Sequence, residues 1–297
     1  MRKIGSLVIT GALVLTMAAG LSGCGVSNSD TNSVTTEETA TAADDENTFV
    51  VGFDAEFPPY GYMADDGTYT GFDLELAQEV CNRNGWTLVK TPIDWDSKDM
   101  ELNSGSIDCI WNGFTMNGRE DDYTWTVPYV DNSIVCVVKS DSKVKYLTDL
   151  SGLNVTVQAD SSGLAALEGD DATDENKTLA ASFANLDQVA DYNTAFMNLE
   201  AGATDAVILD IGVAKYHVNA DPDKYRILDE NITSEEYAVG FKKGNTALRD
   251  KVQETLYAME ADGTIDKIAA EYADYNLPDM ICIEEPATET ATASAAD

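Results

Sequence analysis

Apolar and polar residues follow two different periods along this chain, one typical of buried strands and the other of amphipathic helices. The segment 49–55 is an apolar run that leads into Asp54, and the segment 154–160 repeats this shape and leads into Asp160. A loop is expected after each run. Because a short apolar run followed by a loop is typical of a strand buried on both faces, we expect a strand at each place.

A second pattern also occurs twice, in the same order. The segments 102–108 and 199–205 both read Leu-x-x-Gly-x-x-Asp, and apolar runs follow them at 109–111 and 206–209. A glycine after the last helical turn supplies the left-handed residue that ends a helix, so both places predict a helix, a turn and a strand. Alternating strands and helices of this kind predict two α/β lobes, each with its own sheet.

Helical periodicity is clearest over 70–85, which ends in a glycine. Its apolar stripe consists of Leu74, Ala77 and Cys81, with Leu76 and Val80 beside it. Asp73 and Glu75 lie in the first turn, where the helix dipole favours negative charge. We therefore interpret them as capping or dipole residues rather than as a paired catalytic acid and base. The same periodicity predicts helices over 247–259 and 265–272.

The N-terminus reads as an export signal. Arg2 and Lys3 precede an apolar stretch over 4–21, and the sequence Leu-Ser-Gly-Cys follows, ending at Cys24. This tetrapeptide resembles the lipobox of bacterial lipoproteins, which implies that 1–23 is a cleaved signal peptide and that Cys24 carries the lipid. The alternatives are a plain secretory signal with an incidental cysteine, or a membrane span, which the glycine interruptions disfavour.

Two further segments have a composition that cannot bury enough apolar surface to fold. We expect residues 24–48 to be a lipidated, disordered tether and residues 284–297 to be a disordered acidic tail. With 297 residues, of which 44% are hydrophobic, the chain retains enough material between them for one large domain or two ordinary ones.

Charge and rare residues exclude several functions. The chain has 53 Asp and Glu against 18 Lys and Arg, a net charge of −35, so phosphate backbones repel it and no nucleic-acid binding is expected. The single histidine, His217, disfavours catalytic triads and multi-histidine metal sites. Beyond Cys24, the four cysteines are widely spaced, which favours buried thiols over zinc ligands. A single disulfide between two of them is the alternative. They are Cys81, Cys109, Cys136 and Cys282.

The helical segment also carries a specific motif. Residues 71–84 read Gly-Phe-Asp-Leu-Glu-Leu, three residues, Val-Cys, two residues and Asn. This pattern matches the signature helix of the bacterial extracellular solute-binding proteins of family 3, which the chain thus resembles. Further matching segments are Phe57-Pro58-Pro59-Tyr60, Asn112-Gly113-Phe114-Thr115 followed by Arg119, Val127-Pro128-Tyr129 and Asp262-Gly263-Thr264.

The resemblance implies an α/β fold of the type II, two-lobed periplasmic-binding-protein-like clamshell, in which each lobe is a mainly parallel sheet flanked by helices. Lobe one is expected to comprise 49–132 plus 236–283, and lobe two 133–235. Two hinge strands are expected to cross between the lobes near 131–135 and 234–237.

The resemblance also implies a function: extracytoplasmic capture of a free amino acid by hinge closure and delivery to an ABC permease. The protein is expected to be a monomer held to the cell membrane by its lipid, without cofactor, metal or catalytic activity. The alternative is a periplasmic dehydratase-type enzyme on the same scaffold. The sensor lobe of a receptor and a pure interaction module fit the chain less well.

Ligand-binding residues follow from the same resemblance. Arg119 is expected to clamp the ligand carboxylate in two hydrogen bonds, and Asp210 is expected to accept the ligand ammonium. The rival interpretations are a surface salt bridge for Arg119 and a helix cap for Asp210. Family members place the arginine five residues after the threonine, whereas four residues separate Thr115 from Arg119 here. The other expected ligand-binding residues are Asn112, Gly113, Thr115, Gln158, Ser161 and Ser162.

Specificity is expected from residues at the family's side-chain pocket: Asp54, Phe57, Tyr60 and Trp95, with Glu56 beside them. Aromatic rings there can sandwich a ligand side chain, although each ring can equally belong to the core of lobe one. Asp54 can accept hydrogen bonds from an amide, guanidinium or ammonium group. It therefore favours a polar or basic amino acid, or cystine, over an aliphatic one.

Overall fold

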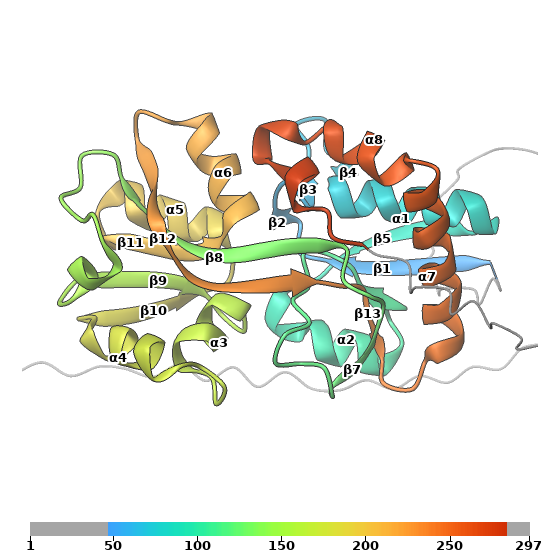
Figure 1. Cartoon of the computed structure of the whole chain (residues 1–297), viewed down its shortest axis with the longest axis horizontal. Coiled ribbons are helices and arrows are strands. Elements are labelled where there is room, and N and C mark those ends of the chain that lie inside the picture. Colours follow the sequence, from blue (N-terminus) through green and yellow to red (C-terminus); the bar gives the residue numbers. More distant parts are fainter. Residues whose placement is uncertain (1–46, 284–297) are drawn as a thin grey trace, which may run out of the picture. The chain divides into compact units, whose positions relative to one another are not determined.

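The computed structural model of this protein describes residues 47–283. The predicted signal peptide, Cys24, most of the predicted tether and the predicted tail lie outside the described residues. Residues 47–283 belong to one compact unit, which contains two five-stranded sheets with helices packed against them (Figure 1).

Lobe one is built on a sheet with the strand order β5-β1-β6-β13-β7. β1 pairs parallel with β5 and β6, and β13 pairs antiparallel with β6 and β7. The strands are β1 Thr48–Phe53, β5 Thr87–Pro92, β6 Cys109–Ile110, β7 Tyr123–Trp125 and β13 Gly240–Lys242. A small antiparallel sheet is formed by β2 Glu56–Phe57, β3 Gly61–Met63 and β4 Tyr69–Thr70.

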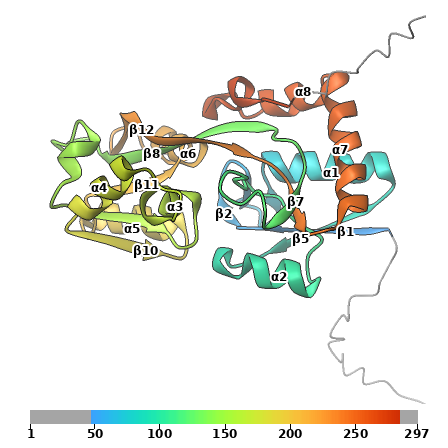
Figure 2. The same ribbon diagram turned by 60° about the horizontal axis from the view of Figure 1, so that its bottom comes forward.

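The helices of lobe one lie on both sides of its main sheet. They are α1 Phe72–Asn84, α2 Lys98–Ser104, α7 Thr246–Ala261 and α8 Thr264–Ala270. Figure 2 shows α1 and α8 on one side of the sheet and α2 on the other. Short 3-10 turns follow at η1 Trp95–Ser97, η3 Ala273–Tyr275 and η4 Leu277–Met280.

Lobe two has a sheet with the strand order β10-β9-β11-β8-β12. β9 pairs parallel with β10 and β11, while β8 runs antiparallel to β11 and β12. The strands are β8 Val130–Lys139, β9 Asn154–Gln158, β10 Asn185–Val189, β11 Ala206–Asp210 and β12 Tyr225–Tyr237. The helices are α3 Ser162–Glu168, α4 Asp174–Ser182, α5 Tyr192–Ala201 and α6 Ile211–Ala220, with the 3-10 turn η2 Leu147–Leu150.

β8 is apolar along most of its length because both of its faces are covered. Successive side chains of a strand point to opposite faces. Val135 and Val137 join the apolar cluster that includes α5 and α6, whereas Ile134, Cys136 and Val138 join the cluster that includes α3. A strand buried on both faces has a continuous apolar sequence rather than an alternating one.

Glycines end the two helices that the repeated pattern predicts. Gly105 follows α2 with φ 83°, and Gly202 follows α5 with φ 74°, both in the left-handed conformation. A strand begins a few residues later in each case, β6 at Cys109 and β11 at Ala206. The helix, turn and strand expected from the pattern are therefore confirmed at both places.

Long strands β8 and β12 connect the lobes. They pair with each other from Val130 and Tyr237 to Lys139 and Tyr225, and they pass between the two lobes in Figure 1. The chain then enters β13 of lobe one, and an isolated bridge joins Tyr237 to Thr115. The two-lobed α/β fold with hinge strands is confirmed, and antiparallel strands accompany the parallel set in each sheet. The residue limits of the lobes stay a prediction.

The first turn of α1 contains Asp73 and Glu75 as the sequence predicts, but it has no side-chain cap. Neither acidic residue caps the helix, because its N-cap position, Gly71, receives no side-chain hydrogen bond. Asp73 is fully buried, and its Oδ2 accepts a hydrogen bond of 2.6 Å from the backbone N–H of Gly113. Glu75 instead accepts a hydrogen bond of 2.7 Å from the hydroxyl of Tyr272. Contacts with distant segments thus replace the local cap.

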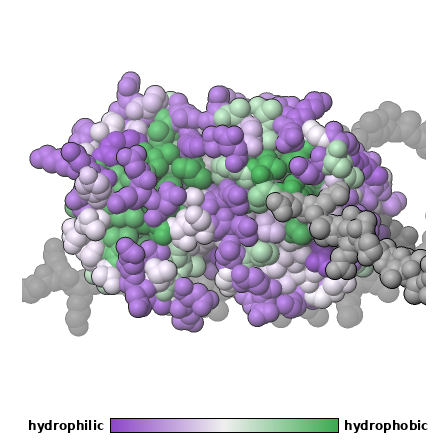
Figure 3. Space-filling model, viewed as in Figure 1, coloured by the Kyte–Doolittle hydropathy of each residue, from purple (hydrophilic) through white to green (hydrophobic). Residues whose placement is uncertain are grey.

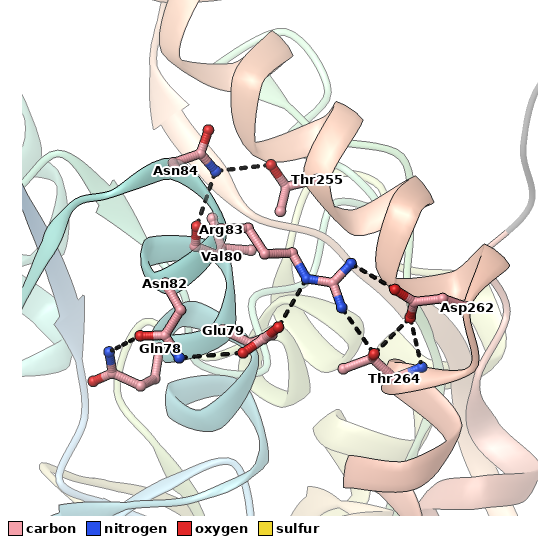
Figure 4. Close-up of polar contacts among 9 residues, drawn as sticks. All are labelled: Gln78, Glu79, Val80, Asn82, Arg83, Asn84, Thr255, Asp262 and Thr264. Atoms are coloured by element: carbon pink, nitrogen blue, oxygen red, sulfur yellow. Dashed lines mark hydrogen bonds and ion pairs between the residues drawn. The ribbon is translucent and has the colours of Figure 1, made fainter.

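The other end of α1 is tied to α7 and α8. Figure 4 shows Arg83 extending toward the turn between these two helices, where it pairs with Asp262 at 2.8 Å and donates to Thr264 at 2.9 Å. Beside it, the side-chain amide of Asn84 donates to the hydroxyl of Thr255 at 2.8 Å. These contacts join two segments of lobe one that lie far apart in the chain.

Most residues on the face seen in Figure 1 are hydrophilic (Figure 3). The large apolar side chains that are exposed lie on separate elements: Met63, Val89, Met100, Tyr146 and Met197. Isolated apolar residues of this kind are common on protein surfaces. Three cysteines, Cys81, Cys109 and Cys136, are buried free thiols, as the sequence favours.

Candidate ligand-binding cleft

A small cavity lies between the lobes, where β6, β9 and β11 end. Open α/β sheets place ligands at the carboxyl ends of their strands. The cavity has a volume of about 10 Å³, which leaves room for about one water molecule, so the lobes are closed over it. Its lining residues are Phe57, Trp95, Asn112, Gly113, Thr115, Arg119, Gln158, Ser161, Ser162 and Asp210.

One wall is the loop that follows β6 in lobe one. Gly113 has φ +55°, and a Cβ there would lie 2.7 Å from the ring of Phe57, so this position requires glycine. The side chain of Asp73 accepts a hydrogen bond from the backbone N–H of Gly113, as described above. Asn112 Oδ1 accepts a hydrogen bond of 3.1 Å from the backbone N–H of Asp54. These contacts fix the backbone of the loop against lobe one.

Arg119 reaches the cavity from a tight turn. Its backbone N–H donates to the carbonyl of Met116 at 2.9 Å, which accommodates the short spacing after Thr115. The half-buried guanidinium lies over the ring of Phe114, 5.3 Å from its centroid, and donates to the backbone oxygens of Thr115 and Asp160 at 3.4 and 3.2 Å. Among residues 47–283 it forms no ion pair, so the predicted rival, a surface salt bridge, is wrong.

Aromatic residues form the side of the cavity near lobe one. The ring of Trp95 packs edge-on against Phe114, with the centroids 5.5 Å apart. Phe57 packs between Tyr60 of its own lobe and Tyr192 of lobe two, at centroid distances of 5.7 and 6.0 Å. Lys98 places its ammonium over Trp95, 5.3 Å from the ring centroid. These contacts hold the rings in place in the closed arrangement.

The wall contributed by lobe two begins at the end of β9. The side-chain amide of Gln158 donates to Asp54 Oδ2 at 2.7 Å and to the carbonyl of Ala190 at 2.9 Å. Ser161 caps α3: its hydroxyl accepts from the N–H of Leu164 at 3.2 Å and donates to the carbonyl of Gln158 at 2.8 Å. The hydroxyl of Ser161 is therefore occupied by the protein itself.

Asp210 occupies the N-cap position of α6, yet no side-chain hydrogen bond caps that helix. Its Oδ1 instead accepts from Asn132 Nδ2 at 2.8 Å and from the hydroxyl of Tyr237. Burial, and next the negative charge of Glu235, raise the pKa of Asp210 well above its ordinary value. The carboxyl group of Asp210 is thus directed to the hinge strands rather than to its own helix.

Several contacts cross from lobe one to lobe two. Gln158 reaches Asp54 as described, and the buried ammonium of Lys98 forms an ion pair with Asp160. Glu56 meets Asp191, and this contact is the largest cause that raises the pKa of Glu56 to about 7. Burial raises the pKa of Asp54. The closed arrangement therefore depends on polar contacts between titratable groups, and a change in their protonation changes these contacts.

Ten of the twelve ligand-binding residues predicted from the sequence line this cavity. Asp54 lies beside it, bonded to Gln158, and also lines an open hollow of about 750 Å³ with Glu56 and Asp191. Tyr60 is fully buried between the rings of Phe57 and Tyr237, so it supports the wall from behind.

The sequence did not point to four residues that belong to this region: Lys98, Asn132, Asp160 and Glu235. Lys98 belongs to none of the motifs described above, and Asn132 and Glu235 lie within the hinge strands β8 and β12. A signal for Lys98 was a lone base among acidic residues just after Trp95. No local signal exists for Glu235.

The part of the chain that the structure describes contains no helix long and apolar enough to cross a membrane. Within the same residues, no three Cys, His, Asp or Glu side chains are grouped so that they could hold a metal ion. His217 lies in lobe two, stacked on the ring of Phe196 at 3.8 Å, and burial lowers its pKa to about 4.

Similar proteins are transport binding proteins. The L-cystine-binding protein TcyJ of Escherichia coli (strain K12) is 26% identical over 275 residues, which are 91% of this chain and 96% of that protein. The crystal structure of an ABC uptake transporter substrate binding protein from Streptococcus pneumoniae with bound histidine is 31% identical, with a TM-score of 0.72. The match covers 76% of this chain and 92% of that one.

A second similar structure is the ancestral amino acid-binding protein AncCDT-1, a precursor of cyclohexadienyl dehydratase. It is 26% identical with a TM-score of 0.69, and the match covers 76% of this chain and 96% of that one. The family model for bacterial extracellular solute-binding proteins, family 3, matches residues 49–275. With its two-lobed fold and the cavity between the lobes, this chain belongs to the bacterial extracellular solute-binding proteins, family 3.

Proposed function

We propose that this protein captures a free amino acid outside the cytoplasm by closing its lobes and delivers it to the permease of an ABC transporter. One observation carries the proposal: Arg119 from lobe one and Asp210 from lobe two line the same cavity. An amino acid bears a carboxylate and an ammonium group, and removing water from both is costly unless each meets a partner. A guanidinium and a buried carboxyl group on opposite walls provide these partners.

The carboxylate of the ligand would lie at Arg119, whose planar guanidinium can donate two parallel hydrogen bonds. Thr115 and Ser162 line the same cavity, and their hydroxyls donate to Glu235 Oε1 at 2.8 and 3.1 Å. The ammonium group would lie at Asp210. Because the two charged partners belong to different lobes, only the closed state satisfies both ends of the ligand, which couples binding to hinge closure.

The side chain of the ligand would point toward Asp54, between Phe57 and Trp95. In the closed cavity Asp54 accepts from Gln158, and a donor group of the ligand can replace that amide. An acceptor in this place, with Glu56 and Asp191 nearby, favours a polar or basic amino acid, or cystine. The relatives named for cystine and histidine support this class.

The experiment is isothermal titration of residues 47–297 with L-arginine, L-histidine, L-cystine and L-leucine. We expect one tight, stoichiometric ligand from the first three, with a Kd of about 1 µM or lower, or about −8 kcal/mol. Arg119→Ala and Asp210→Asn should each abolish binding. Lys224→Ala and Asp223→Asn are matched controls on the exposed surface of lobe two and should leave binding intact. Binding of leucine alone would contradict the proposed side-chain class.

The proposal includes a lipid anchor at Cys24 and action as a monomer at the outer face of the cell membrane. The tetrapeptide that ends at Cys24 supports the anchor. Replacing Cys24 by serine should move the protein from the membrane fraction to the soluble fraction. If Cys24→Ser stays with the membrane, the anchor is not this cysteine.

We infer that the protein binds its ligand without changing it, in contrast to a dehydratase-type enzyme. The amino acid-binding ancestor among the similar structures is compatible with binding on this scaffold. Prolonged incubation of the protein with its ligand, followed by mass analysis, should return the ligand unchanged. Loss of water from the ligand would instead establish the enzymatic alternative.

A further inference from the structure

Two carboxyl groups meet behind the ammonium end of the cleft. Asp210 ends β11 and Glu235 lies in β12, and both are buried, with exposed fractions of 3% and 6%. The side-chain nitrogen of Asn132 donates to both: Nδ2 lies 2.8 Å from Asp210 Oδ1 and 2.8 Å from Glu235 Oε1. Two carboxyl oxygens that share one donor nitrogen are close neighbours. The Oδ1 atom of Asn132 is buried without a hydrogen-bond partner in the described part of the chain.

Glu235 is connected to the walls of the cleft itself. Its Oε1 accepts hydrogen bonds from the hydroxyls of Thr115 at 2.8 Å and Ser162 at 3.1 Å. Both of these residues line the central cavity together with Asp210. Glu235 therefore lies directly behind the first layer of side chains around the expected ammonium position.

Within the described part of the chain, no cation forms an ion pair with Asp210 or Glu235. Arg119 lines the same cavity, but its guanidinium donates to backbone oxygens. The acids Asp73 and Asp54 act on the neighbouring phenols Tyr60 and Tyr192, respectively. Lys215 of α6 lines an open hollow together with Glu235 and Asn132.

Three phenols face the pair from three different elements. They are Tyr60 in the loop between β2 and β3, Tyr192 at the start of α5 and Tyr237 at the end of β12. Burial raises the pKa of each phenol well above its ordinary value, so all three stay neutral. Tyr237 donates to Asp210, but a neutral donor does not balance a second negative charge.

Two ionised carboxylates in such a place are strongly disfavoured, because burial and mutual repulsion both oppose the second charge. Burial and the charge of Glu235 raise the pKa of Asp210 accordingly.

We propose that Asp210 and Glu235 together hold one proton while the cleft is empty, and that the ammonium group of the amino acid takes the place of this proton. The proposal rests on the proposed function, because the amino acid brings the replacing cation. The proton passes to the solvent. One carboxylate and one neutral carboxyl group become two carboxylates and one ammonium group, so the site carries one negative charge before and after. Glu235 thereby becomes a second carboxylate of the ammonium site.

The first experiment needs no ligand. Infrared spectra of the empty protein, recorded as a function of pH, report the band of protonated carboxyl groups. The part that is missing in Asp210→Asn belongs to Asp210. In Glu235→Gln this part should titrate at a lower pH, because the neighbouring negative charge is gone. Glu236→Gln is the matched control: it changes the adjacent residue of β12, which faces the opposite side, and should leave the titration unchanged.

The second experiment counts protons on binding. Titrations with L-arginine and L-cystine are run between pH 5 and 7 in buffers with different ionisation enthalpies, since neither ligand changes its carboxylate or guanidinium charge there. Below the pH at which the empty pair titrates, we expect release of about one proton and a rise in affinity of about tenfold per pH unit. Glu235→Gln should still bind with a flatter pH profile, and Glu236→Gln should behave like the unchanged protein.

The outcomes separate the two proposals. Binding without proton release at any pH, or an unchanged pH profile in Glu235→Gln, overturns the proton exchange while the proposed function stands. If neither ligand binds, the proposed function fails for this ligand class, and the exchange of proton for ammonium fails with it. The infrared titration still decides whether Asp210 and Glu235 share a proton in the empty protein. Absence of an Asp210 band at neutral pH overturns the shared proton directly.

Discussion

Asp73 offers a test of how burial of one carboxyl group affects the stability of this protein. Its side chain is fully buried in α1, and its Oδ2 accepts the N–H of Gly113 at 2.6 Å. Burial raises its pKa from 3.8 to about 7. Asparagine has nearly the same shape and can accept the same hydrogen bond, but it has no proton to lose. Asp73→Asn should therefore fold and keep the loop at Gly113 in place.

The size of the effect follows from linkage. A raised pKa means that the folded protein keeps the proton of Asp73 in a pH range where the unfolded chain has lost it. The stability contributed by this proton is full below about pH 4 and is lost as the pH rises to about 7. One pKa unit corresponds to about 1.4 kcal/mol of unfolding free energy. The free energy of unfolding of Asp73→Asn, relative to that of the unchanged protein, should therefore be about 3 kcal/mol higher at pH 8 than at pH 5.

The assay is urea unfolding at pH 5 and pH 8, with the free energy of unfolding compared at each pH. Glu75→Gln is the matched control, because it removes the same charge from the same helical turn, where Glu75 is only half-buried. Asp73→Ala also has no proton to lose, so its stability should vary with pH as that of Asp73→Asn does, but lie about 1–3 kcal/mol below it at both pH values, because the N–H of Gly113 loses its acceptor. If the stability of Asp73→Asn and of the unchanged protein varies with pH in parallel, the assignment of the proton to Asp73 is wrong.

Three further changes test closure of the lobes. Lys98→Met removes the ion pair that bridges the lobes. We expect the ligand affinity measured by calorimetry to fall about fivefold, or about 1 kcal/mol. Unchanged affinity would show that this ion pair does not favour closure. In Gly212→Ala the new Cβ would lie 2.5 Å from the hydroxyl of Tyr60 in the other lobe, so the radius of gyration from small-angle scattering should increase; equal radii would contradict this contact. The contact between Glu56 and Asp191 raises the pKa of Glu56 to about 7. The empty protein should therefore open as the pH rises through 7, whereas Glu56→Gln should not. Equal radii of gyration at pH 6 and pH 8 in the unchanged protein would contradict this prediction.

Local features of this chain could be predicted because their causes lie within a few residues. The glycines after 102–104 and 199–201 end helices through their own conformational freedom, and both turns appear where the pattern places them. The signature of α1 identifies the family, and with the family come the neighbourhoods of Arg119 and Asp210. Ten of the expected ligand-binding residues line one cavity for this reason.

Residues whose role depends on a distant partner could not be predicted in the same way. Asp73 lies in a helix start where a cap is expected, but the fold decides that it accepts a hydrogen bond from Gly113, 40 residues away, and that burial raises its pKa. Lys98 meets Asp160 because the lobes close, at a separation of 62 residues. Such pairings leave no period and no motif in the sequence.

The strongest case is the carboxyl pair at the hinge. Asn132 reaches Asp210 over 78 residues and Glu235 over 103 residues, because β8 lies between β11 and β12 in the sheet of lobe two. Periodicity and turn chemistry act over a few residues, so they determine helices, strands and their ends. The charge and protonation of a buried site depend on which groups the folded topology brings together. Here the order of the strands decides that two acids meet without an ion-pair partner among residues 47–283.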